Sequence, residues 1–169
     1  MYDSSNIPKN FSIRFVCDDY MKFQHKRVNL IIGNPPFSKI NGKYRSDLLK
    51  INHNKKSTNL AEFILEKSIL NSDYVSMIMP KNLLNTPEFA STRKVLSKHK
   101  IDSIIDFGEN GFKGVLVETI NVMIDTVRNS SLTKIISTTL GQSIIQKSQY
   151  IFDDILPYWV IYRDPFFDK

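Results

Sequence analysis

The sequence predicts an α/β fold with a mostly parallel sheet and an antiparallel hairpin near its C-terminal end. Apolar runs of strand length alternate with helical patterns, in the order 28–32, 59–70, 73–79, 86–99 and 101–107. This alternation is typical of a parallel sheet whose strands are joined through helices. A β-rich stretch then follows a turn punctuated by glycines, which favours a closing hairpin.

The N-terminal strands are predicted from their hydrophobic patterns. Residues 11–17 (FSIRFVC) alternate apolar with polar or charged side chains, which indicates a strand. Residues 28–32 are almost wholly apolar, as expected for a parallel strand covered on both faces. Between 38 and 58 the periodicity is weak, and we expect a long loop, a kind of segment that is usually functional or disordered.

Two helices have recognisable starts. Asn59 with Glu62 three residues later forms a capping-box pattern ahead of an apolar stripe. Thr86 and Pro87 suit the N-cap and first position of the second helix.

The later strands follow these helices. Residues 73–79 are predicted to form a strand that Pro80 ends. Residues 101–107 are predicted to form the next strand, and 115–127 are expected to pair antiparallel with it. Residues 133–138 are a candidate further strand.

Composition limits the classes of protein that need considering. The chain has 169 residues, a net charge of +6 and no apolar run of about 18 residues, so no membrane span is expected. Its N-terminus lacks the pattern of a signal peptide. A single cysteine, Cys17, fits the reducing cytoplasm, and we expect it to be a buried strand residue rather than a nucleophile. The three histidines are scattered without zinc spacing, so no metal site is predicted.

The most informative stretch is Asn34-Pro35-Pro36-Phe37, directly after the strand at 28–32. Consecutive prolines stop both strand and helix, and Asn34 is biased toward extended geometry because a proline follows it. The sequence therefore predicts a stiff loop at the carboxyl end of a strand, where open α/β sheets bind ligands. An amide and an aromatic ring on such a loop suit a flat ligand with hydrogen-bonding edges, such as a nucleobase.

Basic residues gather directly after this loop. Lys39, Lys43 and Arg45 begin a run that extends to Lys56 and contains one acid, Asp47. The run is either a solvated face or a contact surface for phosphates.

The stretch Asn34-Pro35-Pro36-Phe37 resembles the catalytic motif of the N6-adenine DNA methyltransferases of restriction–modification systems, of the Eco57I-like type. The resemblance implies a partial Rossmann-like sheet of the kind that uses S-adenosylmethionine. It also implies that Asn34 and the carbonyl of Pro35 accept hydrogen bonds from the amine of a flipped adenine, with Pro36 completing the loop and Phe37 stacking on the base. Two acceptors placed in this way could draw the amine's lone pair out of the ring and stabilise the charge that develops on it.

Three other stretches agree with the family. Asp19, with Asp18 as a competitor, occupies the position expected near the cofactor's adenine, although a plain helix cap is the alternative. Asn59 begins a segment that contributes to the cofactor pocket in the family, unless it is an ordinary cap. Phe112 is the candidate for the opposite wall of the base pocket, whereas Phe107 suits the core.

The sequence also departs from the family. The glycine-rich turn that holds the cofactor's methionine moiety is not found, because Gly33 is the only glycine before Asn34. The match covers roughly residues 11–130. We therefore expect residues 1–140 to be the catalytic-loop half of a methyltransferase domain, inactive alone, and 141–169 to begin a target-recognition module or linker. The expected partners are DNA and either a missing N-terminal half or an endonuclease.

The family's strand order has a further consequence. It would leave the strand at 28–32 as an exposed apolar edge, so self-association into a homo-oligomer is expected. Two rival functions remain: a glutamine-amide methyltransferase of release factors, which shares the Asn-Pro-Pro-aromatic motif, and a non-catalytic DNA-binding remnant.

Overall fold

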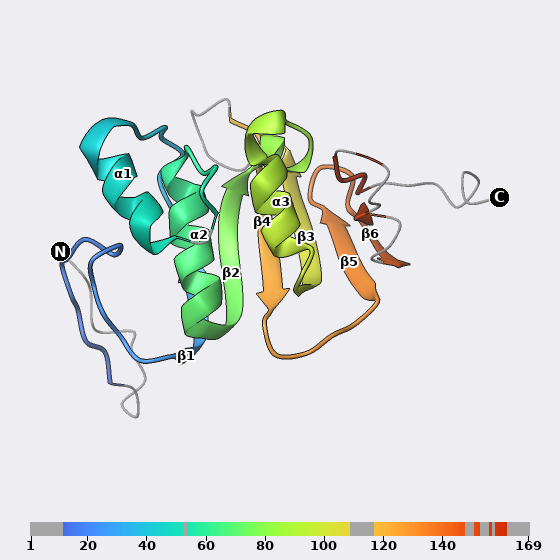
Figure 1. The fold of residues 1–169 in the computed structure, drawn as a ribbon. Coiled ribbons are helices and arrows are strands. Elements are labelled where there is room, and N and C mark those ends of the chain that lie inside the picture. The colour runs from blue at the N-terminus through green and yellow to red at the C-terminus, as the bar shows by residue number, and fades with distance from the viewer. Residues whose placement is uncertain are drawn as a thin grey trace.

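A six-stranded mixed sheet with helices packed on one face forms the body of the molecule (Figure 1). The structure, a computed structural model, describes residues 12–52, 54–108, 117–147, 151–152, 156 and 158–161. The strands are β1 (Val28–Gly33), β2 (Ser72–Pro80), β3 (Lys100–Gly108), β4 (Thr119–Asp125), β5 (Leu132–Ser137) and β6 (Gln142–Lys147). The helices are α1 (Gly42–Ile51), α2 (Leu60–Asn71) and α3 (Ala90–Leu96), with short 3₁₀ turns η2 (Lys81–Leu84) and η3 (Pro87–Phe89).

The strand order is β1-β2-β4-β3-β5-β6. The α/β class is confirmed, and β4 runs antiparallel to β3 as predicted, but it lies between β2 and β3 and pairs with both. Two pairings are parallel, β1 with β2 and β3 with β5, and the other three are antiparallel. The sheet is therefore mixed.

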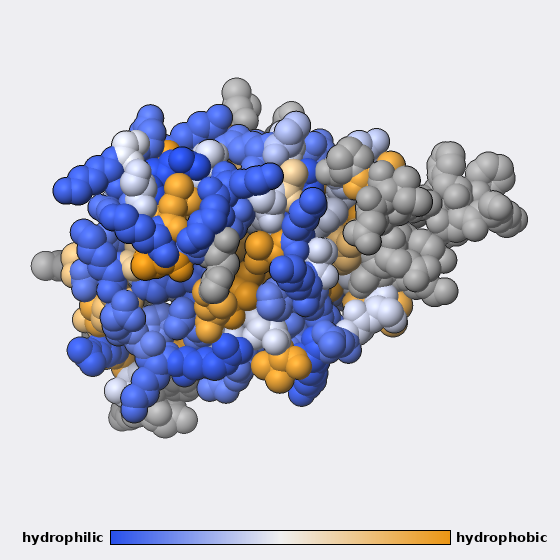
Figure 2. All heavy atoms as spheres, viewed as in Figure 1, coloured by the Kyte–Doolittle hydropathy of each residue, from blue (hydrophilic) through white to orange (hydrophobic). Residues whose placement is uncertain are grey.

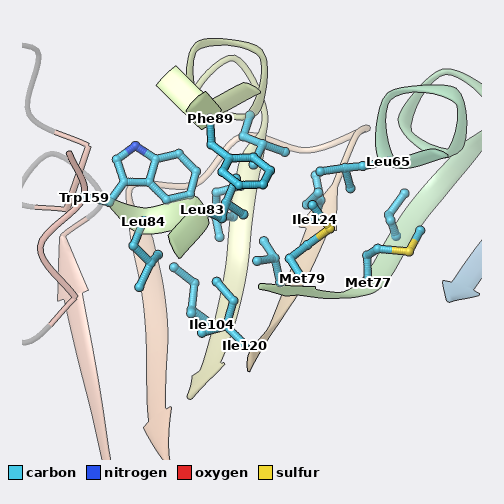
Figure 3. Packing of buried hydrophobic residues seen from close by; sticks show 14 of the residues in the cluster. Leu65, Met77, Met79, Leu83, Leu84, Phe89, Ile104, Ile120, Ile124 and Trp159 are labelled. Atoms are coloured by element: carbon cyan, nitrogen blue, oxygen red, sulfur yellow. The ribbon is translucent and has the colours of Figure 1, made fainter. Parts of the chain in front are cut away.

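The main core lies between the sheet and the helical layer (Figure 3). Met77, Met79, Ile104 and Ile120 project from the central strands and are at most 1% exposed. They meet buried side chains of α2, η2, η3 and α3: Leu65, Leu83, Leu84, Phe89 and Leu96. Each such side chain contributes about 1.5–3 kcal/mol on burial, so this region carries most of the stability.

The residues expected to begin a second module contribute to this same core. β6 extends the sheet beside β5, and Ile151, Trp159 and Ile161 join the buried cluster. Trp159 donates its backbone N–H to the Leu84 carbonyl at 2.7 Å, and its ring meets Phe152 edge-on, with centroids 4.5 Å apart.

Three predictions for the N-terminal part were wrong. Residues 12–17 form no strand, and Cys17 is an exposed free thiol instead of a buried strand residue. A strand requires a neighbouring strand for its backbone groups, and none of the strand pairings among the described residues includes this segment. The stretch 38–58 is not a continuous loop, because it contains α1, whose Leu48 packs with Met21 and Phe63 in a second small cluster.

β1 is the edge of the sheet, as the family's strand order implies. Ile31 packs against the main core, but Val28, Leu30 and Ile32 are 39%, 48% and 74% exposed. The expectation that this strand is covered on both faces is therefore wrong for the described chain. No described helix combines the length and apolar character needed to cross a bilayer.

Candidate active site

The loop Asn34-Pro35-Pro36-Phe37 leaves the carboxyl end of β1, as predicted. Asn34 is exposed, whereas Pro35 is buried and the half-buried Phe37 packs against the main core. The amide is thus presented to solvent on a loop whose following residues are anchored. Such an arrangement keeps a hydrogen-bonding group available and limits the entropy lost when it binds a ligand.

Backbone hydrogen bonds join this loop to the start of α2. The Leu60 N–H donates to the Ser38 carbonyl at 2.9 Å, and the Ile40 N–H donates to the Thr58 carbonyl at 2.8 Å. Lys39 and Asn59 form an isolated antiparallel bridge between the same two segments. The position of Asn34 therefore depends on α2 as well as on β1.

The start of α2 is held by a complete capping box. The side chain of Asn59 accepts from the Ala61 N–H at 3.0 Å, and Glu62 Oε1 accepts from the N–H groups of Thr58 and Asn59, each at 3.0 Å. Asn59, a predicted cofactor residue, is only 5% exposed. Its side-chain oxygen already caps the helix, which is the alternative role that the sequence left open.

A buried polar cluster behind the cap ties the loop to α3. Thr92 donates to Glu62 Oε2, and the Asn54 N–H lies 3.2 Å from both oxygens of Glu66. Asn54 also donates from its side chain to Thr92 at 3.3 Å. Glu62, Glu66, Asn54 and Thr92 are each at most 8% exposed. Sequence reasoning assigned Glu62 a cap but missed the cluster. Its signal is a pair of glutamates four residues apart within the mostly apolar first two turns of the helix.

Asp19 and Asp18 differ in how they are held. Asp19 Oδ1 accepts from the Met21 N–H at 2.9 Å, and its Oδ2 lies 3.5 Å from both the Tyr44 hydroxyl and the Lys22 ammonium. Asp18 is exposed and accepts only from the Asp19 N–H among the described groups, at 2.7 Å. Asp19 therefore has more contacts than Asp18, since it also lies against Tyr44 of α1.

Lys67 of α2 secures the turn that contains Asp19. Its ammonium donates to the carbonyls of Tyr20 and Phe23 at 2.5 and 2.6 Å and lies 4.9 Å from the Tyr20 ring centroid. Burial lowers the pKa of Lys67, and the nearby Asp19 carboxylate opposes that shift. Burial first, and then Asp19, raises the pKa of Tyr44. These contacts make the Asp19 turn part of the α2 surface.

Three charged side chains meet at the carboxyl ends of β2 and β3. Lys81, directly after β2, is 3.2 Å from Asp106 Oδ2 and 3.1 Å from Glu118 Oε1. Burial alone would lower the pKa of Lys81, but hydrogen bonds and charge from Glu118 and Asp106 outweigh it, so the pKa is raised. Lys81 thus joins the end of β3 to the start of β4. Phe112, predicted to line the base pocket, lies outside the described residues.

The three basic residues predicted to bind substrate have different surroundings. Lys39 pairs with Glu88 at 3.6 Å, and Lys43 is exposed in the first turn of α1. Arg45 donates from Nε to the Ser57 carbonyl at 2.9 Å and is half-buried, so it braces the segment between α1 and α2. Within the described part of the chain, no three His, Cys, Asp or Glu side chains gather in a way that could hold a metal ion.

The described residues do not complete a pocket for S-adenosylmethionine. No glycine-rich cradle precedes Asn34 in the described segment 12–33, because its one glycine, Gly33, packs against β2. A Cβ at Gly33 would lie 2.7 Å from Met77 Sδ. The described residues include an exposed asparagine on an anchored loop and an acidic turn, but no glycine-rich turn of the kind that would hold the methionine moiety.

A family model described as "Eco57I restriction-modification methylase" matches residues 3–112. Solved structures are similar in fold. A putative class I S-adenosylmethionine-dependent methyltransferase from Listeria monocytogenes is 16% identical with a TM-score of 0.59, over 70% of this chain and 39% of that protein. The methyltransferase subunit of a type I restriction–modification system from Streptococcus thermophilus is 16% identical with a TM-score of 0.57, over 82% and 32%.

The type IIG restriction endonuclease BpuSI is 13% identical with a TM-score of 0.66, over 84% of this chain and 22% of that protein. This chain therefore spans less than half of the length of each of the three structures. No curated protein sequence was found to match it. At these identities the structural likeness shows the fold, which is that of class I methyltransferases.

Proposed function

We propose that this chain, which belongs to the Eco57I restriction-modification methylase family, supplies the base-binding half of an N6-adenine DNA methyltransferase. The observation that carries this proposal is the exposed Asn34 on a loop anchored at Pro35, Phe37 and the start of α2. The side-chain oxygen of Asn34 and the carbonyl of Pro35 accept hydrogen bonds from the exocyclic amine of an extrahelical adenine. Phe37 contributes the stacking ring.

These acceptors have a chemical role in methylation at nitrogen. The amine of adenine is a poor nucleophile because its lone pair is delocalised into the ring. Two oxygens that hold the amine hydrogens favour a tetrahedral nitrogen, and they stabilise the positive charge that builds on it. In the complete enzyme the methyl group comes from S-adenosylmethionine, and Asp19 is the residue of this chain best placed to contact that cofactor.

The 169 residues are proposed to be inactive alone, since the described segment before Asn34 has no cradle for the methionine moiety. Activity then requires a glycine-rich cofactor-binding segment, in the same polypeptide or in a partner. Mass spectrometry of nucleosides from unmethylated DNA tests this requirement. N6-methyladenine is expected only when the chain is combined with such a segment of the same family, and its absence from every combination would contradict the split-enzyme proposal.

Base recognition can be tested without cofactor. A labelled duplex with one extrahelical adenine is compared with the same duplex carrying extrahelical cytosine, and binding is followed by fluorescence anisotropy. We expect a preference for adenine that Asn34→Ala removes, because cytosine places its amine differently against the two acceptors. Asn129→Ala, at an exposed asparagine between β4 and β5, is the matched control. Equal affinity of the unaltered chain for both duplexes would overturn the assignment of the loop.

A further inference from the structure

We propose that a groove beside the candidate active site holds the phosphate backbone of the DNA next to the target base, an inference that rests on the proposed function. The groove has a volume of about 480 Å³ and is open to solvent. We call it the lysine groove. Its lining residues are Lys39, Lys56, Thr58, Pro87, Glu88, Ala90, Ser91 and Lys94.

The lysine groove is continuous with the anchored loop. Lys39 comes two residues after Phe37 and forms the bridge to Asn59, while the Thr58 carbonyl receives the Ile40 N–H. The opposite wall comes from η3 and α3, which Thr92 fixes to Glu62 at the start of α2. The two walls of the groove, one from Lys39 and Thr58 and the other from η3 and α3, are therefore linked through the hydrogen bonds at the start of α2.

Positive charge dominates the groove. Three lysines from three separate segments face one carboxylate, Glu88. Both oxygens of Glu88 are engaged, since Oε2 pairs with Lys39 at 3.6 Å and Oε1 accepts from the Thr58 hydroxyl at 3.2 Å. Lys56 and Lys94 are exposed and form no salt bridge with any described carboxylate. Their charges remain available to an anionic ligand.

The lining suits a phosphate backbone better than an apolar ligand. Lysines and hydroxyls, here Thr58 and Ser91, are among the groups that contact phosphate and sugar in DNA complexes. The apolar side chains are small, Pro87 and Ala90, and the concavity is open, so an enclosed small-molecule site is not favoured. The hydrophilic surface in Figure 2 surrounds narrow apolar strips over the helical face. Phosphates bound in the lysine groove would flank a base held at Asn34.

The test compares two triple variants of equal charge. Lys39, Lys56 and Lys94 are changed to Gln in one, and Lys26, Lys98 and Lys134, which are exposed elsewhere, are changed to Gln in the other. Binding of the full chain to a labelled mixed-sequence duplex is measured by anisotropy at a series of salt concentrations. Circular dichroism confirms that each variant is folded.

The groove variant is expected to bind more weakly by on the order of 10- to 100-fold near 0.1 M salt, and its dependence of log affinity on log salt should be less steep by about 2 to 3. The control variant should lose a few-fold at most, because separated surface charges are screened. Glu88→Gln, which leaves all three lysines in place, should strengthen binding.

The outcomes separate this inference from the function on which it rests. If the chain binds duplex DNA and both triple variants weaken it equally, the groove assignment is overturned while DNA remains the substrate. If inorganic phosphate displaces the DNA better than sulfate at equal ionic strength, the groove is a site for free phosphate and the inference is also wrong. If the unaltered chain shows no salt-dependent binding to DNA, the DNA substrate itself is rejected.

Discussion

The strands β3 and β1 differ sharply in how they are supported. β3 lies between β4 and β5, and its Ile101 and Ile104 are at most 1% exposed. Among the described strands β1 pairs with β2 alone, and three of its apolar side chains are more than a third exposed. Yet β1, not β3, delivers Asn34. The candidate active site is therefore built on an edge strand of the sheet, and its order depends on the start of α2 as well as on β1.

The largest expected effect contrasts the two strands directly. Ile104→Ala in β3 should lower the free energy of unfolding by about 3–4 kcal/mol, because it leaves a cavity in a closed core. Ile32→Ala in β1 should lower it by less than about 0.5 kcal/mol, because the side chain is already mostly in water. Urea denaturation measures both. Similar losses at the two positions would show that β1 is covered in solution.

The next effect tests whether α2 orders the loop. Glu62→Gln should cost about 2 kcal/mol, because a buried charged acceptor of three hydrogen bonds is replaced by an amide that matches them less well. Hydrogen exchange at the Ile40 and Leu60 amides should accelerate more than exchange in β3. Glu118→Gln, at a half-exposed glutamate, is the control and should cost less than about 1 kcal/mol.

A smaller, pH-dependent effect on stability is expected from Asp125, which lies in the well-supported central part of the sheet. Burial alone would raise the pKa of Asp125 at the end of β4, but hydrogen bonds from the Arg128 and Val127 amides and the charges of Lys100 and Arg128 lower it. A carboxyl whose pKa is lowered by folding stabilises the protein above its unfolded pKa of 3.8, and this contribution is lost as the pH falls through the folded value.

Asp125→Asn should therefore cost about 1 kcal/mol at neutral pH. The difference from the unaltered protein should shrink below about pH 4. Denaturation at several pH values measures it. A constant difference across the whole range would mean that the charge of Asp125 has no part in stability.

The smallest effect on stability accompanies a change in association. Ile32→Lys should alter the free energy of unfolding by less than about 0.5 kcal/mol, because the side chain is exposed. It should nevertheless reduce self-association, since a charge on an apolar edge strand discourages edge pairing. Light scattering at increasing concentration tests this, with Ile145→Lys on β6 at the other edge as control. A monodisperse unaltered monomer would contradict the expectation.

The features that could be predicted from the sequence are those that depend on residues close together in the chain. Asn34-Pro35-Pro36-Phe37 and the Asn59 capping box were predictable because proline geometry and helix caps depend on residues close in the chain. The strand predicted at 11–17 failed because alternation describes which side chains could face a core, whereas a strand also needs a partner. α1 was missed because its pattern is weak and only Leu48 is buried. The links from Glu62 to Thr92 and from Lys81 to Asp106 join distant residues, which no local pattern encodes.

The position of β4 has a consequence for the synthesis of the protein. β2 is made well before β4 and β3 shortly before it, but β2 and β3 do not pair with each other, because β4 lies between them and pairs with both. Contacts between distant segments form late and slow folding. On the ribosome, the two flanking strands would carry open apolar edges until Asp125 has emerged. We therefore expect the nascent chain to depend on chaperones during that interval and to gain protease resistance only after β4 and the later core residues, which include Trp159, have emerged.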